Sequence, residues 1–247
     1  MSATLEKPVA VVTGASSGIG AATARALAQH GFHVVVGARR ADRLDELARE
    51  IHGTAFPLDV TDAASVAAFC ATVENCSVLV NNAGGAIGAD SIADSNLDEW
   101  RAMFEVNVLG TLSMTQALLP KLIESGDGRI VNIGSIAARE PYRGGGGYNA
   151  AKHAVSALSR VLRIEMLGQP VRITQIDPGL VETEFSVRRF DGDKERARSV
   201  YAGMTPLRAE DIAETIAWVI SRPRHMNIDT MLILATEQTS AQVVHRG

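Results

Sequence analysis

Tyr148 and Lys152 can exchange protons, and they stand four positions apart in the sequence. At the start of a predicted helix this spacing places both side chains on one face, with their Cβ atoms about 6 Å apart. A free tyrosine has a pKa of about 10, and lowering it to about 7 takes roughly 4 kcal/mol of preferential stabilisation of the phenolate. An ammonium at this distance supplies up to about 3 kcal/mol at an effective dielectric constant of about 20. The pair therefore indicates acid and base catalysis, although a Tyr-x-x-x-Lys pair alone is common by chance.

A glycine-rich turn at residues 13–20, TGASSGIG, could hold a phosphate group. Gly14, Gly18 and Gly20 permit a tight turn and let backbone N–H groups of the next helix approach a pyrophosphate, whose charge the helix dipole favours. The spacing is G-x-x-x-G-x-G rather than the more familiar G-x-G-x-x-G, and a purely structural turn is the alternative.

Two arginines, Arg39 and Arg40, follow the second apolar stretch, and no acidic residue comes before Asp42. An enzyme for the unphosphorylated dinucleotide needs an acidic residue near this position to bind the ribose hydroxyls, whereas arginine suits a 2′-phosphate. The alternative is a solvated basic helix start, but basic residues are disfavoured at the positive end of a helix. The pair predicts NADP(H) as the cofactor.

The elements that must position these residues alternate along the chain. Apolar stretches predict buried strands at residues 9–12, 34–36, 55–58, 78–80, 129–133 and 171–176. Apolar spacing predicts a helix from Ile19 to His30, a second over 44–51, and others starting near Asp62, Asn96 and Tyr148. The alternation predicts an α/β fold, a Rossmann-type doubly wound parallel sheet with helices on both faces.

We expect one domain spanning residues 1–247, because no linker rich in proline, glycine and serine divides the chain. The segment 178–203 is long, charged and weakly periodic, as lids and binding loops often are, and we expect it to cover a substrate.

Composition excludes several classes of protein. Hydrophobic residues make up 46% and the net charge is −4, so the chain is expected to fold and has no global electrostatic reason to bind nucleic acid or a membrane surface. No apolar run approaches the length of a membrane helix, residues 1–7 do not resemble a signal peptide, and we expect a cytoplasmic protein. The two cysteines, Cys70 and Cys76, predict no disulfide framework, and the histidines show no metal-ligand spacing.

Together, the motifs resemble those of the short-chain dehydrogenase/reductase family over nearly the whole chain. Four segments match the positions at which that family binds its cofactor. They are the turn at 13–20, the pair at 59–60, NNAG at 81–84 and the segment from 177 to Thr183. With the two arginines, the expected cofactor residues are Gly14, Ser16, Ser17, Gly18, Ile19, Gly20, Arg39, Arg40, Asp59, Val60, Asn82, Ala83, Gly84, Tyr148, Lys152, Pro178, Gly179, Val181 and Thr183.

The resemblance also implies a catalytic tetrad of Asn107, Ser135, Tyr148 and Lys152. It implies that Tyr148 is the general acid in carbonyl reduction and the general base in alcohol oxidation. Ser135 would polarise the substrate oxygen. Lys152 would bind the nicotinamide ribose and lower the pKa of Tyr148, and Asn107 would hold a water that relays protons to Lys152.

Several segments in the last third of the chain resemble the subgroup of NADP-dependent 3-hydroxy acid dehydrogenases. They are residues 178–193, 205–207, 210–214, 227–234 and 245–247, together with Thr236 and Gln238. This subgroup oxidises serine, L-allo-threonine, 3-hydroxypropanoate and related acids. One alternative is a broad carbonyl reductase for neutral ketones. Another is a non-catalytic NADP(H) sensor or scaffold, but the intact tetrad argues against it. The resemblance further implies a homotetramer that pairs the predicted helices 96–124 and 148–168.

An acidic substrate needs a fixed cation near Ser135 and Tyr148, and arginine can bind a carboxylate through two parallel hydrogen bonds. The candidates are Arg139, four residues after Ser135, and Arg189 in the expected lid, each with a surface salt bridge as the alternative. Arg143 and Arg188 are expected to be solvated. The run of glycines at 144–147 is expected to widen the pocket and loosen specificity.

Overall fold

Within residues 7–247, seven parallel strands form one sheet in the order β3-β2-β1-β4-β5-β6-β7. They are β1 (Val9–Thr13), β2 (His33–Ala38), β3 (Thr54–Pro57), β4 (Val78–Asn81), β5 (Gly128–Ile133), β6 (Val171–Pro178) and β7 (Thr230–Ile233). This computed structural model describes residues 7–247, so most of the segment in which we looked for a signal peptide lies outside the described residues. The six strands predicted from the sequence are present, while β7 was not predicted.

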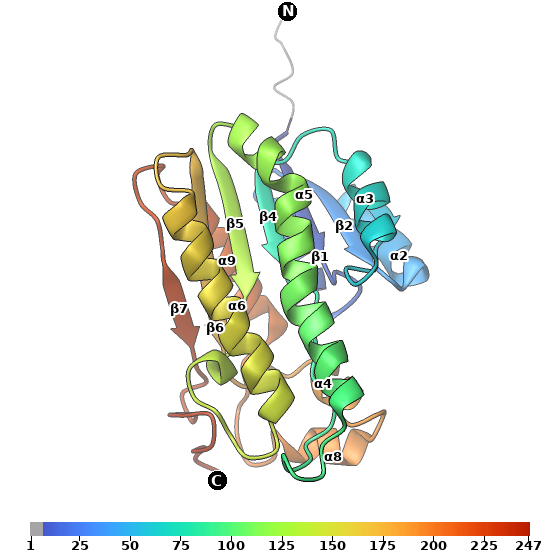
Figure 1. Ribbon diagram of the computed structural model, residues 1–247, viewed down its shortest axis with the longest axis vertical. Coiled ribbons are helices and arrows are strands. Elements are labelled where there is room, and N and C mark those ends of the chain that lie inside the picture. Colours follow the sequence, from blue (N-terminus) through green and yellow to red (C-terminus); the bar gives the residue numbers. More distant parts are fainter. Residues whose placement is uncertain (1–6) are drawn as a thin grey trace, which may run out of the picture.

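Helices cover both faces of the sheet. They are α1 (Gly18–Gln29), α2 (Ala41–Ile51), α3 (Ala63–Ala71), α4 (Leu97–Phe104), α5 (Gly110–Glu124), α6 (Gly146–Glu165), α7 (Glu184–Arg189), α8 (Lys194–Ser199) and α9 (Ala209–Ile220). Alternate strand residues point to opposite faces. Val12 therefore packs in the core with α1, α2 and α9, whereas Val11 packs in the core with α3 and α5. Figure 1 shows α5 and α6 in front of the sheet, and the predicted doubly wound α/β fold is confirmed.

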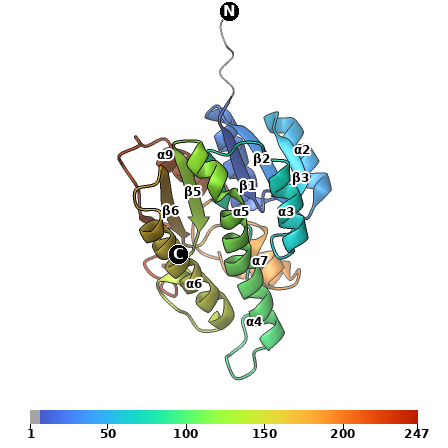
Figure 2. The ribbon, with the colours of Figure 1, turned by 45° about the horizontal axis from the view of Figure 1, so that its top comes forward.

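The carboxyl ends of the strands share one edge of the sheet, as parallel strands require. The expected lid, residues 178–203, starts at the last residue of β6 and contains the short helices α7 and α8. In Figure 1 the strands run downwards and α8 lies below them, and Figure 2 shows α7 at the same end of the molecule as α4. The lid thus lies at the edge where open α/β sheets bind their ligands.

The predicted helix starting at Asn96 is not continuous. Asn96 caps α4, but a five-residue π-helix, Glu105–Leu109, separates α4 from α5. The helix expected to start at Tyr148 begins at Gly146 and ends at Glu165, before Gly168, whose φ is +87°. Among the described residues, no helix is long and apolar enough to cross a membrane.

Candidate active site

The glycine-rich turn is held against β4 by Asn82. The amide of Asn82 donates to the carbonyls of Thr13 at 2.9 Å and Gly14 at 3.2 Å. A Cβ atom at Gly20 would lie only 2.4 Å from the same amide nitrogen, and Gly14 adopts a φ of +65°. Glycine is therefore required at these two positions by close packing and by backbone conformation.

The turn opens onto a cleft of about 720 Å³ at the carboxyl edge of the sheet. Every residue that we named for the cofactor lines it except Gly20, which lies beneath the turn. The volume lies in the range of small-molecule and cofactor sites. The backbone turn at the start of α1 and the arginines at its rim fit a phosphorylated dinucleotide.

At the rim, Arg40 is fixed by two serine hydroxyls of the turn. Its Nε and Nη2 donate to Ser16 Oγ at 3.1 and 2.9 Å, and Nη2 also donates to Ser17 Oγ at 2.7 Å. Arg39 is exposed beside Asp59, whose pKa is lowered mainly by the hydrogen bonds that its carboxylate accepts from Thr61, with a smaller contribution from Arg39. The rim therefore carries fixed positive charge next to the turn.

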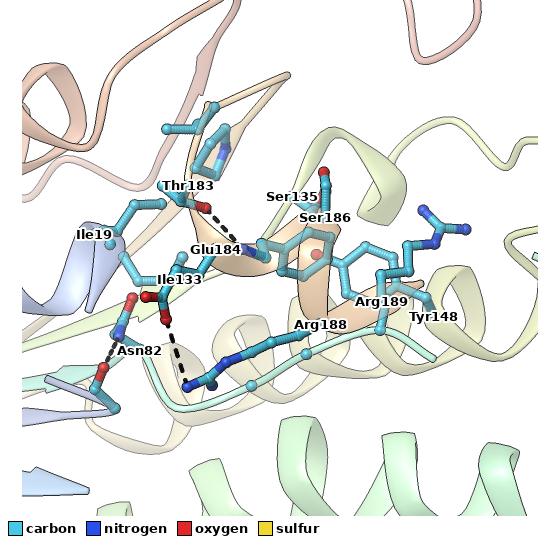
Figure 3. A pocket seen from close by; sticks show the side chains of 18 of the residues that line it. Ile19, Asn82, Ile133, Ser135, Tyr148, Thr183, Glu184, Ser186, Arg188 and Arg189 are labelled. Atoms are coloured by element: carbon cyan, nitrogen blue, oxygen red, sulfur yellow. Dashed lines mark hydrogen bonds and ion pairs between the residues drawn. The ribbon is translucent and has the colours of Figure 1, made fainter. Parts of the chain in front are cut away.

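The four expected catalytic residues come from three different elements around the end of β5. Ser135 precedes a short 3₁₀ helix, Ile136–Ala138, and its Oγ accepts a hydrogen bond from the Ala137 N–H at 3.1 Å. Tyr148 lies in the first turn of α6, with Lys152 one turn later. Tyr148, Ser135 and Lys152 line the cleft, and Asn107 lies behind Gly84. In Figure 3 Ser135 and Tyr148 are seen with Arg189 beside the lid helix α7.

The pKa of Tyr148 is shifted in the direction opposite to the one expected from the sequence. Burial raises the pKa of its phenol above the ordinary value, Tyr142 raises it further, and Ser135 and Arg189 oppose the shift. The sequence spacing indicates the effect of the Lys152 ammonium, which lies 5.7 Å from the centre of the Tyr148 ring, but not the burial of the phenol. In the protein alone the pKa of Tyr148 is therefore raised rather than lowered.

Lys152 is itself buried beneath the cleft. Its Nζ donates to the Ile133 carbonyl at 2.8 Å, and burial lowers its pKa to about 8, against an opposing effect of Asp177. The ammonium form is consequently favoured below a pH of about 8. A cation at this place stabilises negative charge on Tyr148.

Asn107 sits in the π-helix, where its side chain is fixed at three points. Its amide donates to the carbonyls of Gly85 and Met103 at 2.8 and 2.7 Å, and its Oδ1 accepts from the Gly85 N–H at 3.2 Å. A Cβ atom at Gly84 would lie 2.5 Å from Asn107 Oδ1 and 3.7 Å from Lys152 Nζ. The irregular turn therefore brings Asn107 close to Lys152, consistent with the frequent occurrence of π-helical turns at functional sites.

Arg139, one candidate carboxylate anchor, is not brought to the cleft. Its Nε donates at 2.7 Å to Asp177, a buried carboxylate that also accepts from the Ser135 N–H at 3.2 Å and from Gln175 at 2.6 Å. Arg139 does not line the cleft. Because the buried carboxylate of Asp177 binds its guanidinium outside the cleft, Arg139 is the weaker of the two candidate anchors.

Arg189, the other candidate, lines the cleft near Tyr148. Its nitrogens donate to the carbonyls of Gly88 and Gly144 at 2.9 and 3.2 Å and to the Tyr142 hydroxyl at 2.9 Å. A guanidinium has five N–H groups, so one on each terminal nitrogen is left for a ligand. The three hydrogen bonds hold Arg189 in a fixed orientation.

The glycine run at 144–147 leaves little empty space, a cavity of about 20 Å³. A Cβ atom at Gly145 would lie 2.4 Å from the Tyr142 ring, and one at Gly146 would lie 2.7 Å from the Trp100 ring. The expectation of a widened pocket is wrong, because aromatic side chains fill the room that the missing Cβ atoms leave.

Four residues of α7 line the cleft although the sequence did not assign them to it: Glu184, Phe185, Ser186 and Arg188. Glu184 reaches Arg40 and Arg43, and Arg188, which we expected to be solvated, lines the cleft and lies 3.9 Å from Glu184. Figure 3 shows Arg188 extending towards Glu184, away from Arg189. The i, i+4 spacing of Glu184 and Arg188 is visible in the sequence, but their relation to Arg40 depends on the tertiary structure.

Comparison with known proteins gives consistent similarities. The family model for short chain dehydrogenase matches residues 8–194. An uncharacterised oxidoreductase of Mycobacterium tuberculosis is 62% identical over 235 residues, covering 95% of this chain and 94% of the relative. An NADP-dependent 3-hydroxy acid dehydrogenase of Schizosaccharomyces pombe is 40% identical, covering 98% of each chain. Among solved structures, the closed form of serine dehydrogenase complexed with NADP+ has a TM-score of 0.92 at 38% identity and covers 97% of this chain and 100% of that one.

Proposed function

The chain belongs to the short-chain dehydrogenase family, and we propose that it interconverts a small 3-hydroxy acid and its 3-oxo acid. It is an NADP-dependent oxidoreductase that acts on a CH–OH group. Serine, L-allo-threonine and 3-hydroxypropanoate are the substrates that we expect. The observation that carries this proposal is the fixed guanidinium of Arg189 in the same cleft as Ser135 and Tyr148. A cation that keeps N–H groups available beside the reacting alcohol favours a substrate that carries a carboxylate.

In this proposal the bound cofactor supplies or accepts the hydride. The Ser135 hydroxyl donates a hydrogen bond to the substrate oxygen and polarises it. Tyr148 gives its proton to that oxygen during reduction and takes it back during oxidation. The Lys152 ammonium stabilises the phenolate that forms in between, which counteracts the effect of burial on the pKa of Tyr148. Asn107 positions a water from which Lys152 is reprotonated.

In this proposal, residues at both ends of the cleft bind the cofactor. We assign the 2′-phosphate to Arg39 and Arg40, the pyrophosphate to the turn at 13–20, and the nicotinamide half to the segment from Pro178 to Thr183. Thr183 packs against the turn, since a Cβ atom at Gly18 would lie 3.3 Å from its side chain. The lid therefore starts directly beside the cofactor site.

The substrate class is tested by a panel of acids and neutral ketones in wild-type protein and in Arg189→Ala. Removing the anchor is expected to raise the KM for the acid about tenfold or more, as the loss of a charged hydrogen bond worth about 1.5 to 3 kcal/mol implies. A neutral ketone that reacts in the same cleft should be affected much less. The measurement is the absorbance of NADPH with L-serine, L-allo-threonine and 3-hydroxypropanoate, and with a ketone in the reverse direction.

Arg139→Ala is the matched control. It also removes an arginine, but one that lies outside the cleft and is bound to Asp177. It should leave the ratio of acid to ketone efficiency unchanged. If Arg189→Ala leaves this ratio unchanged as well, the anchor is wrong and a broad carbonyl reductase becomes the better assignment. Failure to turn over any member of the panel would favour a non-catalytic NADP(H) sensor.

We also propose that the chain forms a homotetramer. Large apolar side chains are exposed on neighbouring helices, among them Leu97 and Phe104 on α4 and Val161 and Ile164 on α6, where Ile164 is 74% exposed. A self-complementary interface formed by these helices would cover them. Light scattering during gel filtration at micromolar concentration should give four times the mass of one chain, and a monomer would contradict the proposal.

The cytoplasm is the compartment that we propose for the protein. Cys70 and Cys76 are free and buried, and unpaired cysteines are typical of a reducing compartment.

A further inference from the structure

The carboxylate of Glu184 joins the lid to the end of the cleft that we assign to the cofactor's 2′-phosphate. Glu184 is the first residue of α7 and directly follows Thr183. Its two carboxylate oxygens accept hydrogen bonds from Arg40 Nη1 at 2.9 Å and from Arg43 Nη1 at 2.6 Å. These contacts join the lid to residues more than 140 positions away in the sequence, at the rim that receives the cofactor.

The charge around Glu184 is strongly positive. Its hydrogen bonds with Arg43 and Arg40 lower its pKa to about 2, so it is ionised at any ordinary pH. Burial and the repulsion of Arg40, Arg39 and Arg43 lower the pKa of Arg188. Asp42 and Glu46 are further negative charges that act on Arg43, with smaller effects than Glu184. Three arginines, Arg40, Arg43 and Arg188, thus lie within 4 Å of the Glu184 carboxylate, an excess of positive charge at this point that suits an anion with more than one negative charge.

A 2′-phosphate bound at Arg40 would share the guanidinium nitrogen that Glu184 holds. Arg40 uses Nε and Nη2 on Ser16 and Ser17, and its Nη1 is the nitrogen that faces Glu184. A phosphate bound to Nη1 of Arg40 would stand beside the carboxylate and repel it. An alternative partner lies close by, because Arg188 is 3.9 Å from Glu184 on the same helix.

We propose that Glu184 occupies the place of the cofactor's 2′-phosphate, and that NADP(H) must displace it from Arg40 and Arg43 towards Arg188. The inference rests on the proposed assignment of Arg40 to the 2′-phosphate. Glu184 is then a specificity-determining residue that weakens the binding of the phosphorylated cofactor. The same displacement releases the start of α7 from the rim, so the lid responds to NADP(H) but not to NAD(H).

The test compares ligands with and without the 2′-phosphate in Glu184→Gln, which removes the charge and keeps the size of the side chain. Titration calorimetry should show NADP+ and 2′,5′-ADP binding about two- to fivefold more tightly than to wild type, as expected for the loss of a competing, partly exposed ion pair. NAD+ and 5′-AMP should bind as they do to wild type. Thermal unfolding of the variant checks that the fold is retained.

Two further variants separate the possible failures. Glu195→Gln removes a carboxylate from α8 of the same lid and should leave the affinity for all four ligands unchanged. Arg40→Gln should weaken NADP+ and 2′,5′-ADP but not NAD+ and 5′-AMP. Suppose that Arg40→Gln weakens only the two ligands with a 2′-phosphate, while Glu184→Gln leaves the affinity for NADP+ unchanged or lowers it. The proposal that NADP(H) displaces Glu184 is then wrong, and Glu184 instead positions Arg40. If Arg40→Gln does not discriminate, the 2′-phosphate assignment itself is wrong.

Discussion

Tyr148→Phe is expected to lower kcat at least about a hundredfold, the effect of removing a general acid and base. Phenylalanine keeps the ring that packs against Phe185, with centroids 5.6 Å apart, and removes only the hydroxyl that exchanges the proton. The buried surroundings of this residue leave bulk water little opportunity to replace it. Turnover is measured by NADPH absorbance with the best acid of the panel.

The affinity for NADPH, measured by its fluorescence, should change little in this variant, because the cofactor's phosphates are bound elsewhere in the cleft. Tyr201→Phe is the matched comparison. It removes a phenol from the lid that bonds to Ser186 and to the Val181 carbonyl, and its effect on kcat should be much smaller. Near-full turnover by Tyr148→Phe would remove this residue from the mechanism.

Gly134→Ala is expected to destabilise the protein by about 3 kcal/mol, since buried groups must move to admit one methyl group. The added Cβ atom would lie 2.0 Å from Asp177 Oδ1, inside the network that joins this carboxylate to Ser135, Gln175 and Arg139. For a chain of this length the loss corresponds to a Tm lower by roughly 6 to 12 °C. Scanning calorimetry at fixed protein concentration measures it.

Gly85→Ala is the control for this stability measurement, because the Cβ that it adds would have no atom of the described residues within 4 Å apart from its chain neighbours. It should shift Tm by far less. An unchanged Tm for Gly134→Ala would show that Asp177 can move without loss, and the network around Ser135 would then contribute little to the fold.

The fold was predictable where strand and helix patterns are strong. Buried valine stretches such as those of β1 and β2 identify central strands of a parallel sheet, which are apolar on both faces. The edge strand β7 was missed, although Met231, Leu232 and Ile233 form a short apolar stretch in the sequence. Helix α9 was also missed, although Ile212, Ile216 and Ile220 repeat at helical spacing and are buried.

The candidate site was predictable where a residue acts through its own type and its place in a motif. Tyr148 and Lys152 are close because helical spacing alone brings them together. The partners of Arg139 and Glu184 could not be predicted in this way, because Asp177 and Arg40 approach them only through the fold. Likewise, the packing of Trp100 and Tyr142 into the glycine run depends on segments far apart in the chain.

The π-helix at Glu105–Leu109 has an evolutionary consequence. A π-helical turn holds one residue more than an α-helical turn, so it corresponds to a single-residue insertion in an otherwise continuous helix. Deleting one residue here would restore a regular α-helical turn and remove the extra residue by which this turn presents Asn107. Asn107 would then leave Gly85 and Lys152, or the apolar face of α5 would leave the sheet. Length variation in this lineage should therefore be tolerated in the loops on either side of α4 and α5, but not within this joint.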